Sequence, residues 1–466
     1  MTTRITTDNI TDGTIAAADL SNLPNVVDWQ TVIVADGSTN TTAETGKGYI
    51  IDTSSATHTI NLPASPSAGD TVAVIQSGVS AVTVGRNGSN ILSSAADKTM
   101  SLNASVSFVY SGNATIGWVQ SNNDVPDSFI SATGGTETTS GNYKIHTFTS
   151  TGCFTVSSTA SCTSNDEVSY LVVAGGAGGG GGSTCSNWGG AGGGAGGYRE
   201  AKSSADDYTA SPTAATTGIT VTVQTYPITV GGGGAGKAFG DPNSSGKGSP
   251  GNNSVFSTVT SAGGGGGGSR SYPGCIPNHH GANGGSGGGG AGNNLASYPS
   301  GMPGGSGNTP PVSPSQGSNG GTGGYSGAGG GGGSTNGSGG VSAPDVPSTL
   351  GGGPGGTGLS TSISGSSSTY AGGGGGGAAA QTPSTPGPIP SSVGGKGGGP
   401  GGPAGGGGAG GNAKPPGCGG NTDGTAGTSN TGGGGGGAGG GAIINPAAKS
   451  GAAGGSGIVI IRYKYQ

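Results

Sequence analysis

Short runs in which apolar and polar residues alternate make up the first part of the chain. Between residues 26 and 120, stretches rich in turn-forming residues, such as 63–69 and 85–89, separate these runs. A period of two places every second side chain on one face, which is the pattern of half-buried β-strands. The sequence therefore predicts an all-β domain over residues 26–120, with about six strands. The predicted strands are 48–51, 57–62, 71–76, 81–84, 106–110 and 117–120.

Two polar segments flank this domain. Residues 1–25 carry isolated apolar residues spaced five apart, from Ile5 to Leu20, a spacing that fits neither a helix nor a strand. We expect an arm that docks onto another structure. Residues 121–142 are rich in Ser, Asn, Asp and Thr, and we interpret them as a linker. Because the domain between the two has few large side chains, we expect copies of the chain to associate through it.

Strand patterns resume on both sides of a long glycine-rich region. Alternation returns at 143–149 and 154–157, and the apolar run 168–174 leads directly into the first long glycine tract. After the last tract, another apolar run covers 458–465. An apolar strand with an open edge pairs readily with another strand. We therefore predict that 168–174 and 458–465 pair, and that they close one glycine-rich domain over residues 143–466.

Glycine is concentrated in the second part of the chain. Of the 116 glycines, 14 lie in residues 1–168 and 102 in residues 169–466. Collagen contains a similar fraction but requires glycine at every third position, and uninterrupted runs such as 263–268 exclude that register. Many tracts are six to nine residues long, and they consist almost entirely of Gly and Ala. The glycine-rich region is therefore not a collagen triple helix.

Two structures are compatible with such tracts. Gly- and Ser-rich sequences usually form flexible linkers. The ordered alternative is polyglycine II, a helix with three residues per turn and a rise of about 3.1 Å, whose N–H and C=O groups can bond to neighbouring tracts. Backbone entropy opposes ordering by about 1–2 kcal/mol per residue, so nearly every interior peptide must be paired. Because the tracts are nearly free of serine and adjoin apolar strands, we predict a polyglycine II helix bundle with almost no α-helix.

Charge and hydropathy exclude several classes of partner. The chain has a net charge of −5 and only 8% charged residues, without a basic stripe, so we expect it to bind neither nucleic acid nor an anionic membrane. No apolar segment approaches the roughly 20 residues of a membrane span, and the first residues lack a signal-peptide pattern. We therefore expect synthesis in the cytoplasm and no membrane insertion. The five cysteines have no metal-type spacing.

Nucleotide and metal sites are incomplete in this sequence. Gly231, Gly236 and Lys237 have P-loop spacing, but Ala238 replaces the Ser or Thr that would hold Mg²⁺. Cys275 and the adjacent histidines 279 and 280 provide too few ligands for a metal ion, and a surface loop explains them better. We predict no cofactor and no metal.

Carboxylates suited to glycoside hydrolysis are also hard to identify. That reaction needs two carboxyl groups held about 5–10 Å apart. Glu200, Asp206 and Asp207 fall in predicted loops without an apolar shell, and we interpret the two aspartates as a solvated turn. We therefore predict that the chain is not an enzyme.

Several segments together resemble a known family. YKIHTFTSTGCFTVS at 143–157, SYLVVAGGAGGGGG at 169–182, YPITVGGGGAG at 226–236, SVFSTVTSAGGGGGG at 254–268 and the terminal GGSGIVIIRYKYQ resemble the glycine-rich domain of bacteriophage tail-fibre proteins and adhesins. Residues 46–118, which include GKGYIIDTSSATHTINLPASPSAGDTVAVIQ at 46–76 and VTVGRNGSNI at 82–91, are similar to a small β-domain in fibres of phages of marine bacteria. RITTDNITDGTIAAADL at 4–20 resembles the arms by which fibres attach to a virion.

The resemblance implies a tail-fibre protein located in the virion. On this hypothesis the chain is a homotrimeric adhesin that contacts other phage tail proteins through its N-terminus. Its glycine-rich domain would present loops to a bacterial surface receptor, either an outer-membrane protein or a glycan. The alternatives are a structural or ice-binding glycine-rich protein, although the repeats are irregular, and a fibre-borne polysaccharide depolymerase.

Aromatic residues between the tracts are the candidates for receptor binding. Their rings stack on sugars or protein at little entropic cost. An equally weighted alternative is that some of them cover exposed backbone at the ends of the bundle. The candidate receptor-binding residues are Trp188, Tyr208, Tyr272, His279, His280 and Tyr298.

Overall fold

The chain forms two compact units, within residues 1–128 and 129–466, in a computed structural model. The residues that the structure describes are 27–100, 102, 104–121, 129–160, 163–182, 188–238, 246–269, 279–292, 301–340, 351–379, 405–413, 422–440 and 449–466. The predicted arm over residues 1–25 lies outside them. We call the two units the N-terminal unit and the glycine-rich unit.

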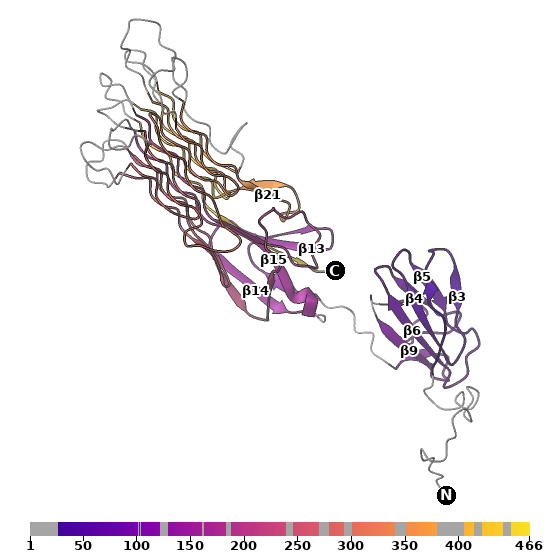
Figure 1. Cartoon of the computed structure of the whole chain (residues 1–466). Coiled ribbons are helices and arrows are strands. Elements are labelled where there is room, and N and C mark those ends of the chain that lie inside the picture. The colour runs from indigo at the N-terminus through magenta and orange to yellow at the C-terminus, as the bar shows by residue number, and fades with distance from the viewer. Residues whose placement is uncertain are drawn as a thin grey trace, which may run out of the picture. The chain divides into compact units, whose positions relative to one another are not determined.

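Two β-sheets enclose the core of the N-terminal unit (Figure 1). The six-stranded sheet has the order β1-β4-β6-β9-β10 with β2 also on β4, and the four-stranded sheet has the order β3-β5-β7-β8. Parallel pairing joins β4 to β6 and β5 to β7, so the strands from β4 to β7 alternate between the two sheets. The strands are β1 (Asp28–Trp29), β2 (Ile33–Val34), β3 (Asn40–Thr42), β4 (Lys47–Asp52), β5 (His58–Asn61), β6 (Thr71–Ser77), β7 (Val82–Gly85), β8 (Lys98–Thr99), β9 (Ser105–Tyr110) and β10 (Trp118–Gln120).

All six strands predicted for the N-terminal unit are present, as β4, β5, β6, β7, β9 and β10. Their inward positions supply the core, in which Ile51, Val74, Phe108 and Trp118 have no exposed surface. The sequence did not indicate β1, β2, β3 and β8, because a strand of two or three residues contains too little alternation to recognise.

The glycine-rich unit begins with two further sheets. The five-stranded sheet has the order β11-β14-β18-β19-β20, and the six-stranded sheet has the order β12-β13-β23-β15-β16, with β17 also on β15. A hairpin of β21 and β22 and a short 3-10 helix, Thr163–Asp166, complete the regular structure of the described residues. The strands are β11 (Ser131–Thr133), β12 (Thr136–Ser140), β13 (Tyr143–Phe148), β14 (Gly152–Ser158), β15 (Glu167–Val173), β16 (Tyr198–Ala201), β17 (Ile219–Thr220), β18 (Thr225–Thr229), β19 (Ser254–Phe256), β20 (Val259–Ser261), β21 (Leu359–Thr361), β22 (Ser368–Tyr370) and β23 (Ile458–Lys464).

The last strand pairs with the strand that precedes the first glycine tract, as predicted. β23 is antiparallel to β15, with Val173 opposite Ile458 and Tyr170 opposite Ile461. On its other side β23 pairs with β13, so it lies inside the sheet and not at an edge. Six of its seven residues are buried, which explains the apolar run. Sequence-distant strands thus close the glycine-rich unit.

The predicted linker over residues 121–142 requires a correction. Its second half contains β11 and β12, which pair with β14 and β13 of the glycine-rich unit. β12 reads TETTS and its residues are mostly exposed, so its sequence lacks the apolar positions by which a strand is recognised. This strand is at the edge of its sheet, where pairing on one side is enough.

Extended glycine-rich segments, which we call rods, run side by side away from the two sheets (Figure 1). The rod 175–182 shows how they associate. Its amides donate no hydrogen bond within the rod, and residues three apart donate to the same neighbour, as Gly175 and Gly178 do to Asn252 and Ser249. The N–H groups of successive residues in this rod donate in turn to three antiparallel rods, around 249–252, 452–455 and 191–194. Its carbonyls accept from three parallel rods, around 234–237, 264–267 and 435–438.

A repeat of three residues per neighbour is the symmetry expected of polyglycine II. The described residues contain no α-helix, and the bonds of this rod all run between rods, so "helix bundle" describes only the threefold repeat. Close packing also explains the composition. A Cβ atom at Gly176 or Gly179 would collide with the carbonyl oxygen of Gly433 or Gly436. Some positions do have room for a methyl group, since Ala177 and Ala191 are fully buried.

Candidate functional site

The rods have two ends, and only one of them adjoins the strands. Residues 174–197 leave β15 and return to β16, and residues 230–253 leave β18 and return to β19. Residues 262–358 and 371–457 likewise run from strand to strand. We call the end of the rods away from the strands the outer end and the other the strand end (Figure 1). At the outer end Gly182 donates to the Lys449 carbonyl at 3.2 Å, and Gly439 donates to the Thr422 carbonyl at 3.2 Å.

Rod residues at the outer end are followed directly by segments outside the described residues. These segments are 183–187, 239–245, 270–278, 293–300, 341–350, 380–404, 414–421 and 441–448. They include Tyr272, Tyr298 and Cys275, so three residues singled out in the sequence have no described position.

Three of the predicted binding residues lie at the outer end. Trp188 begins the rod 188–197, and its Cβ would be 3.1 Å from a Cβ built on Gly292. His279 is 3% exposed, and its carbonyl accepts a hydrogen bond from Ala291 at 2.8 Å. His280 is half-buried, and burial together with the charge of Lys247 lowers the pKa of its imidazole. The structure therefore brings Trp188, His279 and His280 to one end of the unit.

Tyr208 is at the opposite end, which corrects the prediction that it contacts a receptor. It is 5% exposed and its hydroxyl donates to the Ala201 carbonyl at 3.3 Å. Its ring belongs to the same apolar cluster as Tyr198, Leu359 and Tyr370. The prediction was wrong because the segment from 202 to 218 starts at a strand and not at the outer end of a rod.

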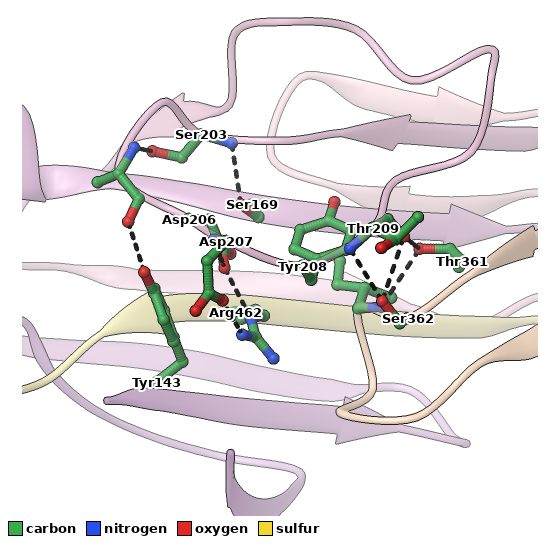
Figure 2. Close-up of polar contacts among 12 residues, drawn as sticks. Tyr143, Ser169, Ser203, Asp206, Asp207, Tyr208, Thr209, Thr361, Ser362 and Arg462 are labelled. Atoms are coloured by element: carbon green, nitrogen blue, oxygen red, sulfur yellow. Dashed lines mark hydrogen bonds and ion pairs between the residues drawn. The ribbon is translucent and has the colours of Figure 1, made fainter. Parts of the chain in front are cut away.

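A buried ion pair holds this segment against the closing strand (Figure 2). Arg462 of β23 extends its Nε to Asp206 Oδ1 at 2.8 Å and its Nη2 to Asp207 Oδ1 at 2.9 Å. The guanidinium also lies over the Tyr143 ring, 4.4 Å from the centroid, and Tyr143 donates to the Ala205 carbonyl at 2.8 Å. The interpretation as a solvated turn is thus wrong for Asp206, which is 9% exposed, whereas the Asp207 side chain is 72% exposed.

Glu200 is the other buried carboxylate in this region. It lies on β16 with 3% of its surface exposed, and not in a loop without an apolar shell as the sequence suggested. Its carboxylate accepts from the Tyr198 hydroxyl at 2.6 Å, the Thr361 hydroxyl at 2.6 Å and the Ser211 amide at 3.0 Å. Burial and the charge of Glu200 raise the pKa of Tyr198 and of Tyr208. These contacts connect β16 to β21, so the observed role of Glu200 is to join elements of the unit.

The sequence contained a signal for the ion pair that our interpretation missed. Arg462 is the one charged residue inside the otherwise apolar run IVIIRY. A charge at a central strand position requires a buried partner. That requirement could have directed attention to Asp206 and Asp207.

Metal-binding and membrane-spanning features were also sought in the described part of the chain. No three His, Cys, Asp or Glu side chains there are grouped so that they could hold a metal ion. No helix there has the length and apolar character needed to cross a membrane.

Comparison with known proteins identifies the glycine-rich unit. No curated protein matches the chain. A family model described as a glycine-rich domain matches residues 149–421, which is more than half of the sequence. The match begins at the end of β13 and covers the rods from 175–182 to 405–413. The chain therefore belongs to the family of proteins with this glycine-rich domain.

Proposed function

We propose that this chain is a receptor-binding fibre protein of a bacteriophage tail. In this proposal the N-terminal part attaches to the virion and the outer end of the glycine-rich unit contacts a receptor on the bacterial surface. The closed course of the rods is the observation that carries the proposal. Because each of the four excursions begins and ends at strands, described rod ends such as Gly182, Gly292 and Gly439 lie together at the outer end. The resemblance of residues 4–20, 46–118, four segments within 143–268 and the terminal segment 454–466 to phage fibres gives independent support.

Such an architecture suits an adhesin for a physical reason. The rods consist of bare backbone whose hydrogen bonds are used between rods, as in 175–182. Recognition must therefore come from side chains at the rod ends and in the segments that join them. A rigid support reduces the ordering cost of those segments when they bind, and several copies on one fibre add avidity.

Immunoelectron microscopy of virions tests the location. An antibody raised against the full chain should label tail fibres of the phage that encodes it. The purified protein should bind host cells saturably and should block adsorption of that phage. Labelling of host cells without any labelling of virions would refute the fibre assignment.

An exchange of loops tests the site. Replacing 270–278 or 293–300 with the corresponding segment of a related fibre should change the range of bacteria bound without changing the thermal unfolding of the protein. The matched control is an exchange of the hairpin residues 364–367, with Gly365 retained, because this hairpin joins β21 to β22 at the strand end. If the control exchange changes the bacteria bound and the outer-end exchanges do not, recognition is not at the outer end.

A further inference from the structure

Three lysines from three different rods lie at the outer end of the glycine-rich unit. Ser249 donates to the Ala235 carbonyl at 2.9 Å and Asn252 donates to the Gly232 carbonyl at 3.0 Å, so the rods 246–253 and 231–238 are antiparallel. This register sets Lys247 beside the outer end of the rod that carries Lys237. Gly451 donates to the Lys237 carbonyl at 3.0 Å, which sets Lys449, two residues earlier, at the same end.

His280 joins this group from a fourth rod. Gly248, next to Lys247, donates to the Gly267 carbonyl, and Ala282, two residues after His280, donates to the Gly266 carbonyl, each at 2.9 Å. Both therefore bond to the same rod, 263–268. The positive charge of Lys247 acts on the imidazole of His280, which is evidence that the two side chains are close. We call Lys237, Lys247, His280 and Lys449 the basic corner.

The rods hold the basic corner in place. Lys237 and Lys247 are half-buried. The side chain of Lys237 covers the rod 175–182, since its Cγ would be 3.3 Å from a Cβ built on Gly181. Asp423 lies on the Lys449 side of this corner, where its carboxylate accepts a hydrogen bond from the Ser450 amide at 2.7 Å. The basic corner thus groups three of the 15 Lys and Arg residues of a chain whose net charge is −5.

We propose that the basic corner binds the anionic groups of a cell-surface polysaccharide, namely its carboxylate, sulfate or phosphate substituents. This inference rests on the proposed function and specifies the receptor class. Lysine is a point charge that tolerates differently shaped anions. Cations on separate rods with a fixed spacing favour a polymer that carries repeated negative charges, because one bound charge raises the local concentration of the next.

Binding to defined polymers provides the test. The full-length protein is titrated with dextran sulfate and with unsulfated dextran of equal length, at about 0.15 M ionic strength, where charges are screened beyond about 8 Å. We expect binding of the sulfated polymer only. The triple variant Lys237→Gln, Lys247→Gln, Lys449→Gln should lose affinity by about tenfold or more, because it removes three charge contacts with the polymer.

A charge-matched control separates this site from general attraction. Lys144, Lys202 and Lys464 belong to the strand end of the same unit, and their triple exchange to Gln removes the same charge. It should leave the affinity within about twofold. Equal loss in both triple variants, or equal affinity for both dextrans, would overturn the proposal. Competition by inorganic sulfate at the same sulfate concentration would instead reveal a site for single anions and would also overturn the polymer assignment.

The outcome is distinguishable from failure of the proposed function. If the Lys237, Lys247, Lys449 triple variant still binds host cells with unchanged affinity, the polysaccharide assignment is wrong while the fibre assignment stands. If the unaltered protein binds dextran sulfate through these lysines but no virion is labelled by the antibody, the fibre assignment is wrong while the anion site stands.

Discussion

Arg462 Nε and Asp206 Oδ1 are 2.8 Å apart, although the two residues are separated by 256 positions in the sequence. Both side chains are 3% exposed. The pair connects the central strand β23 to the segment that follows β16, so it fixes the last strand of the chain to a segment that lies before most of the rods. Breaking a buried ion pair leaves an uncompensated charge, which is costly in a low-dielectric environment.

Removal of Asp206 should destabilise the glycine-rich unit. In the variant Asp206→Ala the buried Arg462 keeps only Asp207, and we expect the free energy of unfolding to fall by about 3 kcal/mol. Asp207→Ala is the matched control, because the side chain of Asp207 is 72% exposed, and its loss should cost less than about 1 kcal/mol. Urea unfolding followed by circular dichroism measures both values. Equal losses of unfolding free energy in the two variants would show that burial of the Arg462–Asp206 pair does not determine its contribution to stability.

Packing of the rods predicts strongly different outcomes for two glycine substitutions. A Cβ at Gly265 would collide with the Ala282 carbonyl oxygen, whereas a Cβ at Gly232 would have only the Asn252 side-chain nitrogen nearby, at 3.8 Å. Gly265→Val should therefore unfold or aggregate the glycine-rich unit, and Gly265→Ala should lower its stability by at least about 3 kcal/mol. Gly232→Ala should be neutral or stabilising by up to about 1 kcal/mol.

Thermal melting monitored by differential scanning calorimetry distinguishes the two positions. If Gly265→Val melts at the temperature of the unaltered protein, the rods are not packed as described. A large loss in Gly232→Ala would show that this rod has a neighbour on its outer face.

Buried His146 should make the stability of the glycine-rich unit depend on pH. The imidazole is fully buried, with Nδ1 2.7 Å from the Gly134 carbonyl and Nε2 3.0 Å from the Tyr463 hydroxyl. Burial lowers its pKa from 6.5; Lys144 acts in the same direction, while Glu137 and the Gly134 carbonyl oppose the shift. The unfolded chain therefore takes up the proton first as the pH falls. Stability is complete above the unfolded pKa of 6.5 and declines below it.

Melting temperatures measured at several pH values from about 7 to about 5 test this dependence, because this interval spans the ordinary pKa of histidine. We expect the melting temperature to fall over this interval. His146→Gln, which can still form hydrogen bonds but does not titrate, should show a smaller fall. An unchanged slope in this variant would assign the pH dependence to other groups, such as His280, whose pKa is also lowered.

Association of copies is a further expectation from the sequence. We expect a homotrimer, with a mass of about three times the 43.0 kDa of one chain. Trp29 and Val34, on the short strands β1 and β2, are 46% and 70% exposed, which is compatible with a covered surface in an assembly. Light scattering of the full chain at micromolar concentration measures the mass. A stable monomer at that concentration would contradict the expectation.

Local patterns were enough to find the longer strands with buried faces but not short or exposed ones such as β1, β8 and β12. The runs 168–174 and 458–465 were recognised and paired correctly, because an apolar run bounded by glycine reports burial directly. β12 was assigned to a linker, because an exposed edge strand contains no apolar face. The threefold packing of the glycine tracts, in which successive residues bond to three neighbouring rods, also followed from their composition, since only Gly and Ala leave space for a neighbouring backbone.

Only the tertiary structure decided which side chains meet. Trp188 and Tyr208 have similar positions in the sequence, each close to a glycine tract, yet Trp188 lies at the outer end and Tyr208 at the strand end. Tracts of nearly identical composition carry no local signal for their direction. Their order and register are set by hydrogen bonds between residues far apart, such as Gly182 with Lys449. The sequence alone therefore determined a strand-closed glycine-rich domain. The register of the rods determined the basic corner, and the central position of β23 in its sheet determined the Arg462–Asp206 pair.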